Sequence, residues 1–284
     1  MIFVMSGCKY EDLMIDYDYN AVYFPKITNT RTIVVGEIHS IEIGVVLGGK
    51  RINEVDEWVD YQIDPSLVPA GFTLLPSNYY ILSNSNRFII PVGSMQGAIT
   101  ISIDTAKFVN DPLAIQAKYV LPFRLIKTSA DSILQEQNTQ VLSLKYEHRL
   151  FGNYYHNGIT TTTSAGGVVT IIGYHQEEPV TNAVNNWIFT TVGPYTVKTS
   201  GIINLKDGLN NTFNLTVKNN NTVVISKNPA SIYNVISGGP CSYNASKKEF
   251  YLQYSYTNAG NIYQATDTLI FRNRVLDGVN QWRW

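Results

Sequence analysis

Apolar and polar residues alternate along most of the chain with a period of two. The alternation is clearest in residues 41–45 and 99–103, where every second residue is Ile or Val. Because neighbouring side chains of a strand point to opposite faces of a sheet, this pattern indicates strands that are buried on one face. Further strands are predicted at residues 87–90, 119–127 and 141–146, with Pro91 and Pro122 marking edges or bulges.

These strands predict a β-sandwich of about immunoglobulin size over residues 18–146. Only one helical turn is expected in this region, at residues 129–135. The side chain of Ser129 can cap the free backbone amides at the start of that turn.

After residue 146 the pattern becomes a succession of hairpins. Asn and Gly, which tolerate the positive φ of tight turns, separate the apolar runs. The predicted strands lie at residues 168–174, at 213–218 paired with 222–226, and at 250–256 paired with 262–271. An up-and-down antiparallel series either closes into a barrel or leaves edges exposed, and we expect closure.

Composition changes at the same place. Of 27 Asn residues, 19 follow Tyr146. We therefore predict three segments: a short leader and tether at residues 1–17, the sandwich at 18–146 and an antiparallel barrel at 147–284.

The charge of the chain is low and balanced. Charged residues make up 15% of the sequence, and 21 basic against 22 acidic side chains give a net charge of -1. Nucleic acids and anionic membranes are recognised by clustered positive charge, so neither is expected as a partner. No apolar run approaches the roughly 20 residues of a membrane-spanning helix.

The residues around Cys8 predict a lipid anchor. The string Met5-Ser6-Gly7-Cys8 follows an apolar stretch and resembles a bacterial lipobox, in which the cysteine is acylated. Residues 1–17 are then a truncated lipoprotein signal and tether, and contact with a membrane occurs only through the lipid. The alternative is an ordinary strand with a chance cysteine. If Cys8 carries lipid, Cys241 has no disulfide partner.

The sequence lacks the motifs of the common catalytic and metal sites. We find no Gly-x-Ser-x-Gly, phosphate-binding loop, His-Glu-x-x-His or Cys-x-x-Cys. A glycosidase would need two carboxyl groups flanking the bond that is cut. The adjacent Glu177 and Glu178 would point to opposite faces of a strand. We expect no enzyme activity, no metal and no cofactor.

Several short clusters combine Asn with Tyr or Trp, a composition that suits carbohydrate. Sugars offer hydroxyl groups for neutral hydrogen bonds and C–H faces that pack on aromatic rings. The candidate carbohydrate-binding residues are Tyr154, Tyr155, Asn186, Trp187, Tyr243, Trp282 and Trp284. Trp187 is the first choice for a stacking platform, with a core position as the alternative. Tyr154 and Tyr155 face opposite ways on a strand, so one is expected to be buried and the other exposed.

Three strings carry a family resemblance. Residues 74–80, 90–94 and 119–124 resemble the N-terminal immunoglobulin-like domain of surface lipoproteins of gut Bacteroidetes. Residues 146–155 are similar to the start of the lipocalin-like domain that commonly follows it. The resemblance implies an all-β protein, with an N-terminal immunoglobulin-like β-sandwich followed by a C-terminal antiparallel lipocalin-like β-barrel.

The resemblance also implies a place and a role. The chain would be a lipid-anchored protein of the outer membrane, exposed at the cell surface as part of a glycan-utilisation system. It would capture glycans without catalysis and present them to an outer-membrane transporter or a surface glycosidase. Two alternatives stay open: a lipocalin-like carrier of a small apolar ligand, and a structural or adhesive subunit.

Three triplets, beginning at Asp104, Asp131 and Asp267, are similar to an O-glycosylation consensus of the same bacteria. Turns and caps built on Asp account for them equally well.

Overall fold

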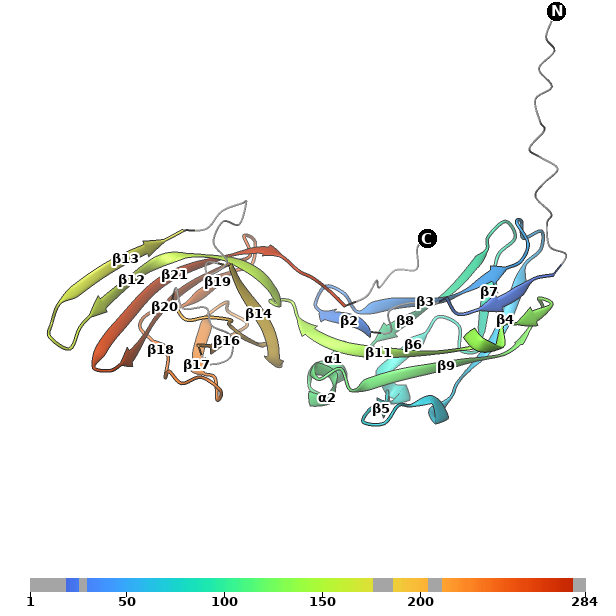
Figure 1. Cartoon of the computed structure of the whole chain (residues 1–284), viewed down its shortest axis with the longest axis horizontal. Helices are drawn as coiled ribbons and strands as arrows, with labels where there is room; N and C mark the ends of the chain where they lie inside the picture. Colours follow the sequence, from blue (N-terminus) through green and yellow to red (C-terminus); the bar gives the residue numbers. More distant parts are fainter. Residues whose placement is uncertain (1–18, 26–29, 176–185, 204–210, 278–284) are drawn as a thin grey trace, which may run out of the picture.

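The computed structural model describes residues 19–25, 30–175, 186–203 and 211–277. The chain is all-β and forms two bodies that follow one another in sequence (Figure 1). The first is an immunoglobulin-like sandwich of two sheets, and the second is a nearly closed antiparallel barrel. The predicted fold class is confirmed.

Two sheets make up the sandwich. The first has the strand order β10 (Ser132–Ile133), β1 (Ala21–Tyr23), β3 (Ser40–Gly48), β8 (Gln96–Ile103) and β6 (Tyr80–Leu82). The second has the order β2 (Thr30–Val35), β11 (Thr139–His148), β9 (Tyr119–Thr128), β4 (Glu57–Ile63) and β7 (Arg87–Ile90), with β5 (Thr73–Leu74) beside β9. The described residues of the sandwich also form two short α-helices, α1 (Thr105–Val109) and α2 (Pro112–Ile115), and three 3-10 helices, Pro65–Leu67, Ser77–Tyr79 and Gln135–Gln137.

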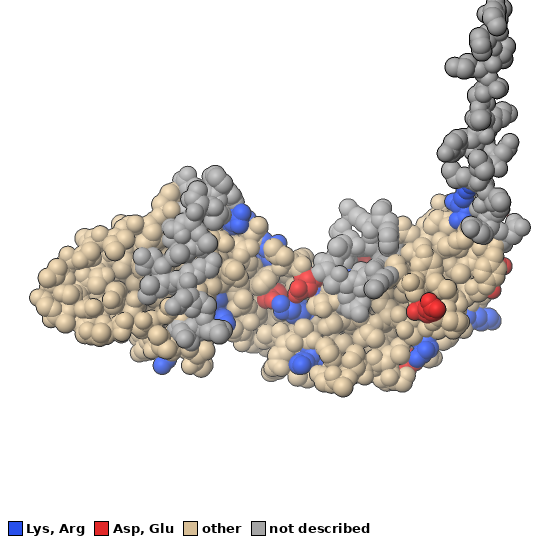
Figure 2. All heavy atoms as spheres, viewed as in Figure 1, with Lys and Arg blue, Asp and Glu red and all other residues tan. Residues whose placement is uncertain are grey.

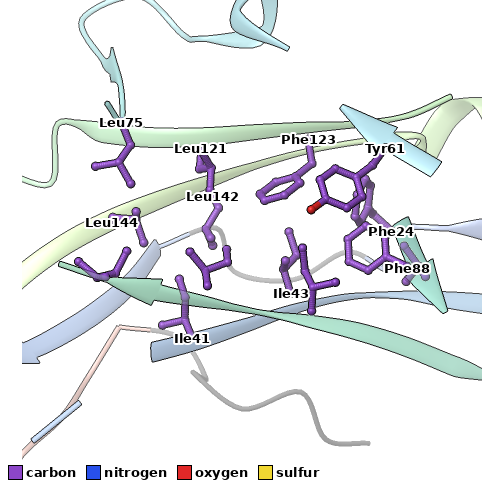
Figure 3. Close-up of a cluster of buried hydrophobic side chains, with 14 of the residues drawn as sticks. Phe24, Ile41, Ile43, Tyr61, Leu75, Phe88, Leu121, Phe123, Leu142 and Leu144 are labelled. Carbon is purple, nitrogen blue, oxygen red and sulfur yellow. The ribbon is translucent and has the colours of Figure 1, made fainter. Parts of the chain in front are cut away.

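Apolar side chains that point inward from both sheets form the core between them (Figure 3). Four aromatic rings meet at one end of that core. Tyr61 packs against Phe88 and Phe123 with ring centroids 4.8 and 5.4 Å apart, and Phe24 lies 5.9 Å from Phe88. Aromatic burial of this kind supplies much of the hydrophobic stabilisation of a sandwich.

Pro122 lies inside β9, at the point where the strand changes partner. Residues Tyr119 and Val120 pair with β5, whereas pairing with β4 begins at Phe123. Neither β5 nor β4 pairs with Pro122 on that side, whereas Val141 of β11 pairs with it on the other. Pro122 therefore lies in a central strand, at a gap in the pairing on one side, and not at the edge or bulge that the sequence predicted.

The expected helical turn at residues 129–135 is wrong. Ser132 and Ile133 form β10 and pair with β1. The hydroxyl of Ser129 accepts a hydrogen bond from the backbone N–H of Trp58 at 2.8 Å and donates to Glu57, so it ties the segment after β9 to the start of β4 and caps no helix. Long-range pairing has therefore overridden a local capping signal.

The barrel is built from one ten-stranded sheet. Its order is β17 (Val223–Lys227), β16 (Phe213–Val217), β15 (Thr196–Lys198), β14 (Asn186–Gly193), β12 (Gly152–Thr163), β21 (Asn261–Asn273), β20 (Glu249–Asn258) and β18 (Ile236–Ser237), with β13 (Val169–Tyr174) beside β12 and β19 (Ser242–Asn244) beside β20. The ends of the sheet meet where Val223 N–H donates to Cys241 O and Tyr243 N–H donates to Asn221 O, at 3.0 and 2.9 Å. These bonds join β17 to the β19 side, as closure requires.

Strand β12 has two successive partners on one side. It pairs with β14 over residues 152–155 and with β13 over residues 158–163, while β21 pairs with it from Asn153 to Thr163 on the other side. The β12–β13 hairpin thus extends past the closed part of the barrel, at the end turned away from the sandwich (Figure 1).

The two bodies are joined through a compact set of polar contacts. The backbone N–H of His148, the last residue of β11, donates to Thr191 Oγ1 at 2.9 Å. Arg274, just after β21, forms an ion pair with Glu37 at 2.6 Å and donates to Phe151 O at 2.9 Å. Tyr146, where the sequence suggested a boundary, is still part of β11.

His148 is itself buried at this junction. Its Nδ1 accepts a hydrogen bond from Leu150 N–H at 3.2 Å. Burial, helped by the nearby Arg149 and Arg274, lowers the pKa of His148 to about 4. The imidazole is therefore neutral at pH 7.

None of the helices in the described part of the chain is long and apolar enough to cross a membrane.

The buried His148 predicts an acid-sensitive junction. Between its unfolded pKa of 6.5 and its folded pKa of about 4, only the unfolded chain binds the proton. Lowering the pH through this window should therefore reduce the free energy of unfolding by about 3 kcal/mol. Urea unfolding of wild type and His148→Asn at pH 4, 5.5 and 7 measures this loss of stability. Asn is chosen because it keeps a hydrogen-bond acceptor near the Nδ1 position but does not titrate. The variant should lose most of this pH dependence, and equal slopes for the two proteins would contradict the assignment.

Candidate functional site

The structure corrects the first candidate from the sequence. Trp187 has 0% exposed surface and lies inside the barrel, with its ring 3.9 Å from that of His156 and 6.0 Å from that of Phe213. A buried ring presents no face to an external sugar, so Trp187 is a core residue. The alternation of β14 explains this, because Trp187 and Phe189 point inward and Ile188 points out.

The remaining candidates are scattered. Tyr154 is buried and stacks on Phe189, while Tyr155 is half-buried on the outer face, where its hydroxyl accepts from Arg272 Nε at 3.1 Å. The two tyrosines therefore point to opposite faces of the strand, as predicted. Tyr243 is buried against Phe250, so it and Tyr154 join Trp187 as corrected candidates. Asn186 is half-buried at the start of β14. Trp282 and Trp284 lie outside the described residues.

A cavity of about 350 Å³ opens at the far end of the barrel. It lies where the β12–β13 and β20–β21 hairpins project beyond the closed part. Its lining residues are Thr160, Thr162, Ile172, Ile203, Tyr233, Tyr256, Asn258 and Tyr263. Each of these side chains is uncharged. The volume falls within the range of small-molecule pockets.

Three tyrosines dominate one wall of this cavity. Tyr256 and Tyr263 are cross-strand partners, and their rings stack almost parallel, with centroids 4.6 Å apart and planes 4° apart. Tyr233 packs on Tyr256 at 4.8 Å, and its hydroxyl accepts from Asn258 Nδ2 at 3.4 Å. Tyr233 and Tyr263 are half-buried, so part of each ring faces the cavity.

A buried carboxylate lies beneath the cavity floor. Asp267, only 1% exposed, accepts hydrogen bonds from His156 Nε2 at 2.7 Å and from the Tyr254 hydroxyl at 2.6 Å. The hydroxyl of Tyr174, on β13, donates to its other oxygen. Asp267 therefore links side chains from β12, β13, β20 and β21.

The two tyrosines of this network keep their protons. Burial raises the pKa of Tyr254 well above its usual value, and Asp267 adds to the shift. Burial and the same carboxylate raise the pKa of Tyr174 in the same way. Both hydroxyls therefore donate to Asp267, and they accept hydrogen bonds from residues that line the cavity: Ile203 N–H to Tyr254 at 2.9 Å, and Thr160 Oγ1 to Tyr174 at 3.3 Å.

The space for Asp267 depends on a glycine in the facing strand. Gly158 is the cross-strand partner of Asp267, and a Cβ built on it would lie 2.3 Å from Asp267 Oδ1 and 2.5 Å from Thr266 O. No side chain fits at either distance. The absence of a side chain at position 158 thus makes the buried carboxylate possible.

A second hollow, of about 430 Å³, lies on the outer face of the same strands. Its lining includes Thr161, Gln253, Gln264 and Thr266, which are polar residues pointing away from the barrel interior. It has none of the exposed aromatic rings of the first cavity.

The charges of the described residues favour a neutral ligand. In Figure 2 the Lys, Arg, Asp and Glu side chains lie mainly over the sandwich and the junction, and the barrel surface on this face is almost free of them. In the described ranges no three His, Cys, Asp or Glu side chains are grouped so that they could hold a metal ion.

Sequence reasoning missed the cavity tyrosines. The sequence of residues 256–263 predicts only a hairpin turn and its ends. The available signal was a pair of tyrosines, Tyr256 and Tyr263, placed symmetrically about Ala259 and Gly260. The register of a tight hairpin places such residues opposite one another. The Asp267 network had no local signal.

A solved structure with a TM-score of 0.71 supports the fold. The model of an N-terminal domain family matches residues 17–132. None of the curated proteins matches the sequence. The crystal structure of a protein of unknown function from Bacteroides ovatus is similar, with a TM-score of 0.71 and 21% identity over 93% of this chain and 100% of that chain. A second protein of unknown function from Bacteroides ovatus has a TM-score of 0.47 and 13% identity, over 92% of this chain and 96% of that chain. A two-domain protein of unknown function from Bacteroides fragilis has a TM-score of 0.38 and 13% identity, over 92% of this chain and 93% of that chain.

Replacing Gly158 by Ala should damage the network. The new methyl group would displace Asp267 or the β21 backbone, and overpacking of this kind costs about 1–3 kcal/mol. Gly166→Ala is the matched control, because that glycine lies in a turn and its nearest neighbour to a new Cβ is Ser164 Oγ at 3.8 Å. Thermal unfolding followed by circular dichroism should show a clear drop in melting temperature for Gly158→Ala only. A drop of similar size in both variants would count against the role given to Gly158.

Proposed function

We propose that the barrel binds carbohydrate, without catalysis, in the cavity beside Tyr233, Tyr256 and Tyr263. The observation that carries the proposal is the combination of exposed aromatic surface and uncharged hydrogen-bonding groups in one cavity of about 350 Å³.

The chemistry of the lining matches that of a sugar ring. One face of a hexose presents C–H groups, which pack on an aromatic ring such as that of Tyr263. Its edge presents hydroxyl groups, which pair with Thr162, Asn258 and the tyrosine hydroxyls. Few and well-placed polar groups among aromatic surface are typical of small-ligand sites.

The same features weigh against the two alternatives from the sequence. A carrier of an apolar ligand needs an empty apolar lumen, and here Tyr154, Trp187, Phe189 and Phe250 fill the barrel. Close packing of this kind leaves no room for a lipid. A purely structural subunit needs no aromatic-lined cavity, whereas this barrel has one at its open end.

We further infer that the protein acts at the surface of the outer membrane, anchored through lipid on Cys8. In Figure 1 the first described residues lie at the end of the sandwich farthest from the barrel, while the cavity lies at the opposite end of the molecule. The sandwich would then act as a spacer that holds the cavity away from the membrane. The family resemblance suggests that a captured glycan passes to a transporter or a glycosidase.

Truncation of Tyr263 tests the site. A glycan array identifies bound glycans, and calorimetric titration of the strongest one measures affinity. Tyr263→Ala should weaken binding about 30-fold, which corresponds to the roughly 2 kcal/mol expected for a central aromatic contact. Tyr251→Ala is the control, since Tyr251 is an exposed tyrosine on the outer face of β20 and should leave affinity unchanged. No binding to any glycan, or equal affinity of wild type and Tyr263→Ala, would refute the proposal.

Replacement of Cys8 tests the anchor. Expressed in a Bacteroides host, the wild-type chain should incorporate labelled palmitate and fractionate with the outer membrane. Cys8→Ser should do neither, because serine cannot form the thioether to lipid. Membrane association that survives this change, while Cys241→Ser also has no effect, would contradict the anchor.

A further inference from the structure

We propose that Asp267 makes the cavity selective by charge, so that it admits uncharged sugars and rejects sugars that carry a carboxylate. This inference rests on the proposed function and specifies its substrate class. Asp267 contacts no ligand in this scheme. It is a specificity-determining residue that acts through its field from below the cavity floor.

The hydrogen bonds around Asp267 require a carboxylate anion. Tyr254 accepts from Ile203 N–H, and Tyr174 accepts from Thr160 Oγ1, so each phenol directs its single proton at Asp267. With both carboxylate oxygens accepting, no proton is left to place on Asp267 itself. The third donor is His156 Nε2.

His156 does not balance this charge. Its Nδ1 is buried and has no hydrogen-bond partner, while its ring packs on Trp187. A proton on Nδ1 would be a buried donor without an acceptor, which is costly. The arrangement assigns the neutral imidazole with its proton on Nε2, and the network keeps a net charge of -1.

This charge lies close to the ligand. Thr160 and Ile203, which line the cavity, bond directly to the two phenols that bond to Asp267. Only one hydroxyl group thus separates either lining residue from the carboxylate. The site is buried, so water and salt screen the charge poorly.

None of the described lining residues offers a positive charge to a carboxylated sugar. The lining residues are Thr, Ile, Tyr and Asn. A second carboxylate in the cavity would meet repulsion from Asp267 at an effective dielectric well below that of water. This repulsion is expected to weaken binding about tenfold or more.

The experiment compares ligands that differ only in charge. A glycan array is printed with glucose, galactose, mannose and their N-acetylhexosamines, and each simple hexose is also printed as its uronic acid and as the methyl ester of that acid. The ester matches the acid in shape but is neutral. We expect wild type to bind uncharged sugars, and to bind esters at least tenfold more tightly than acids.

The outcomes separate the two proposals. Acids bound as tightly as their esters would overturn the charge selectivity while leaving carbohydrate binding intact. If both the acids and their esters are rejected while the parent sugars bind, charge selectivity is also overturned, because shape would then explain the rejection. Binding to no sugar at all on this or the wider array would instead be a failure of the proposed function.

A variant of Asp267 assigns the effect to this residue. Asp267→Asn removes the charge with little change of shape and should bring the ratio of ester to acid affinity close to one. Asp56→Asn is the control. It removes an equal charge in the sandwich, where the Asp56 carboxylate accepts a hydrogen bond from Val92 N–H, and it should leave the ratio unchanged. An unchanged ratio in a folded Asp267→Asn would refute the assignment. If that variant does not melt cooperatively, the wild-type comparison of ester with acid decides the matter alone.

Discussion

A carboxylate that is removed from water is tolerated only if both its oxygens are hydrogen bonded, and Asp267 imposes this requirement on the outer half of the barrel. It is met by one donor from each of three strands, His156 on β12, Tyr174 on β13 and Tyr254 on β20, around an acceptor on β21. The facing position must be glycine for the carboxylate to fit. One buried charge therefore sets the register of four strands and the height of the cavity floor.

The two ends of the barrel are specialised in different ways. Toward the sandwich, the lumen is filled by stacked aromatic rings, and the junction is closed by Arg274, Glu37 and the buried His148. Toward the other end, polar and half-buried side chains line an opening. Aromatic packing fills the barrel near the junction, whereas the far end contains the cavity, and proteins commonly divide a packed scaffold from an open surface in this way.

Much of the fold could be predicted from period-two alternation alone. The strands at residues 41–45, 87–90 and 99–103 all lie within β3, β7 and β8, and the hairpins of the second half have the expected turns. Residues 129–135 could not be predicted, because pairing with β1 depends on a contact more than a hundred residues away. Local propensity is blind to such pairing.

The site was harder to predict for the same reason. Trp187 beside two asparagines looked exposed in sequence, yet the alternation of β14 turns it inward. Tyr256 and Tyr263 become one surface only when the hairpin register is known, and Asp267 meets His156 only because β12 and β21 pair far apart in sequence. Sequence clusters report neighbours along the chain, whereas a binding surface on a sheet is made by neighbours across it.

The placement of β13 has an evolutionary consequence. This strand pairs with β12 beyond the point where β14 takes over, and Ile172 on it forms one wall of the cavity, yet the bonds that close the barrel run through β17 and β19. The turn at Gly166 and Gly167 between β12 and β13 is exposed. Insertions, deletions and substitutions in this hairpin can therefore reshape one wall of the cavity without breaking the closure of the barrel. Relatives that keep the same scaffold can in this way acquire cavities of different shape by altering a single hairpin.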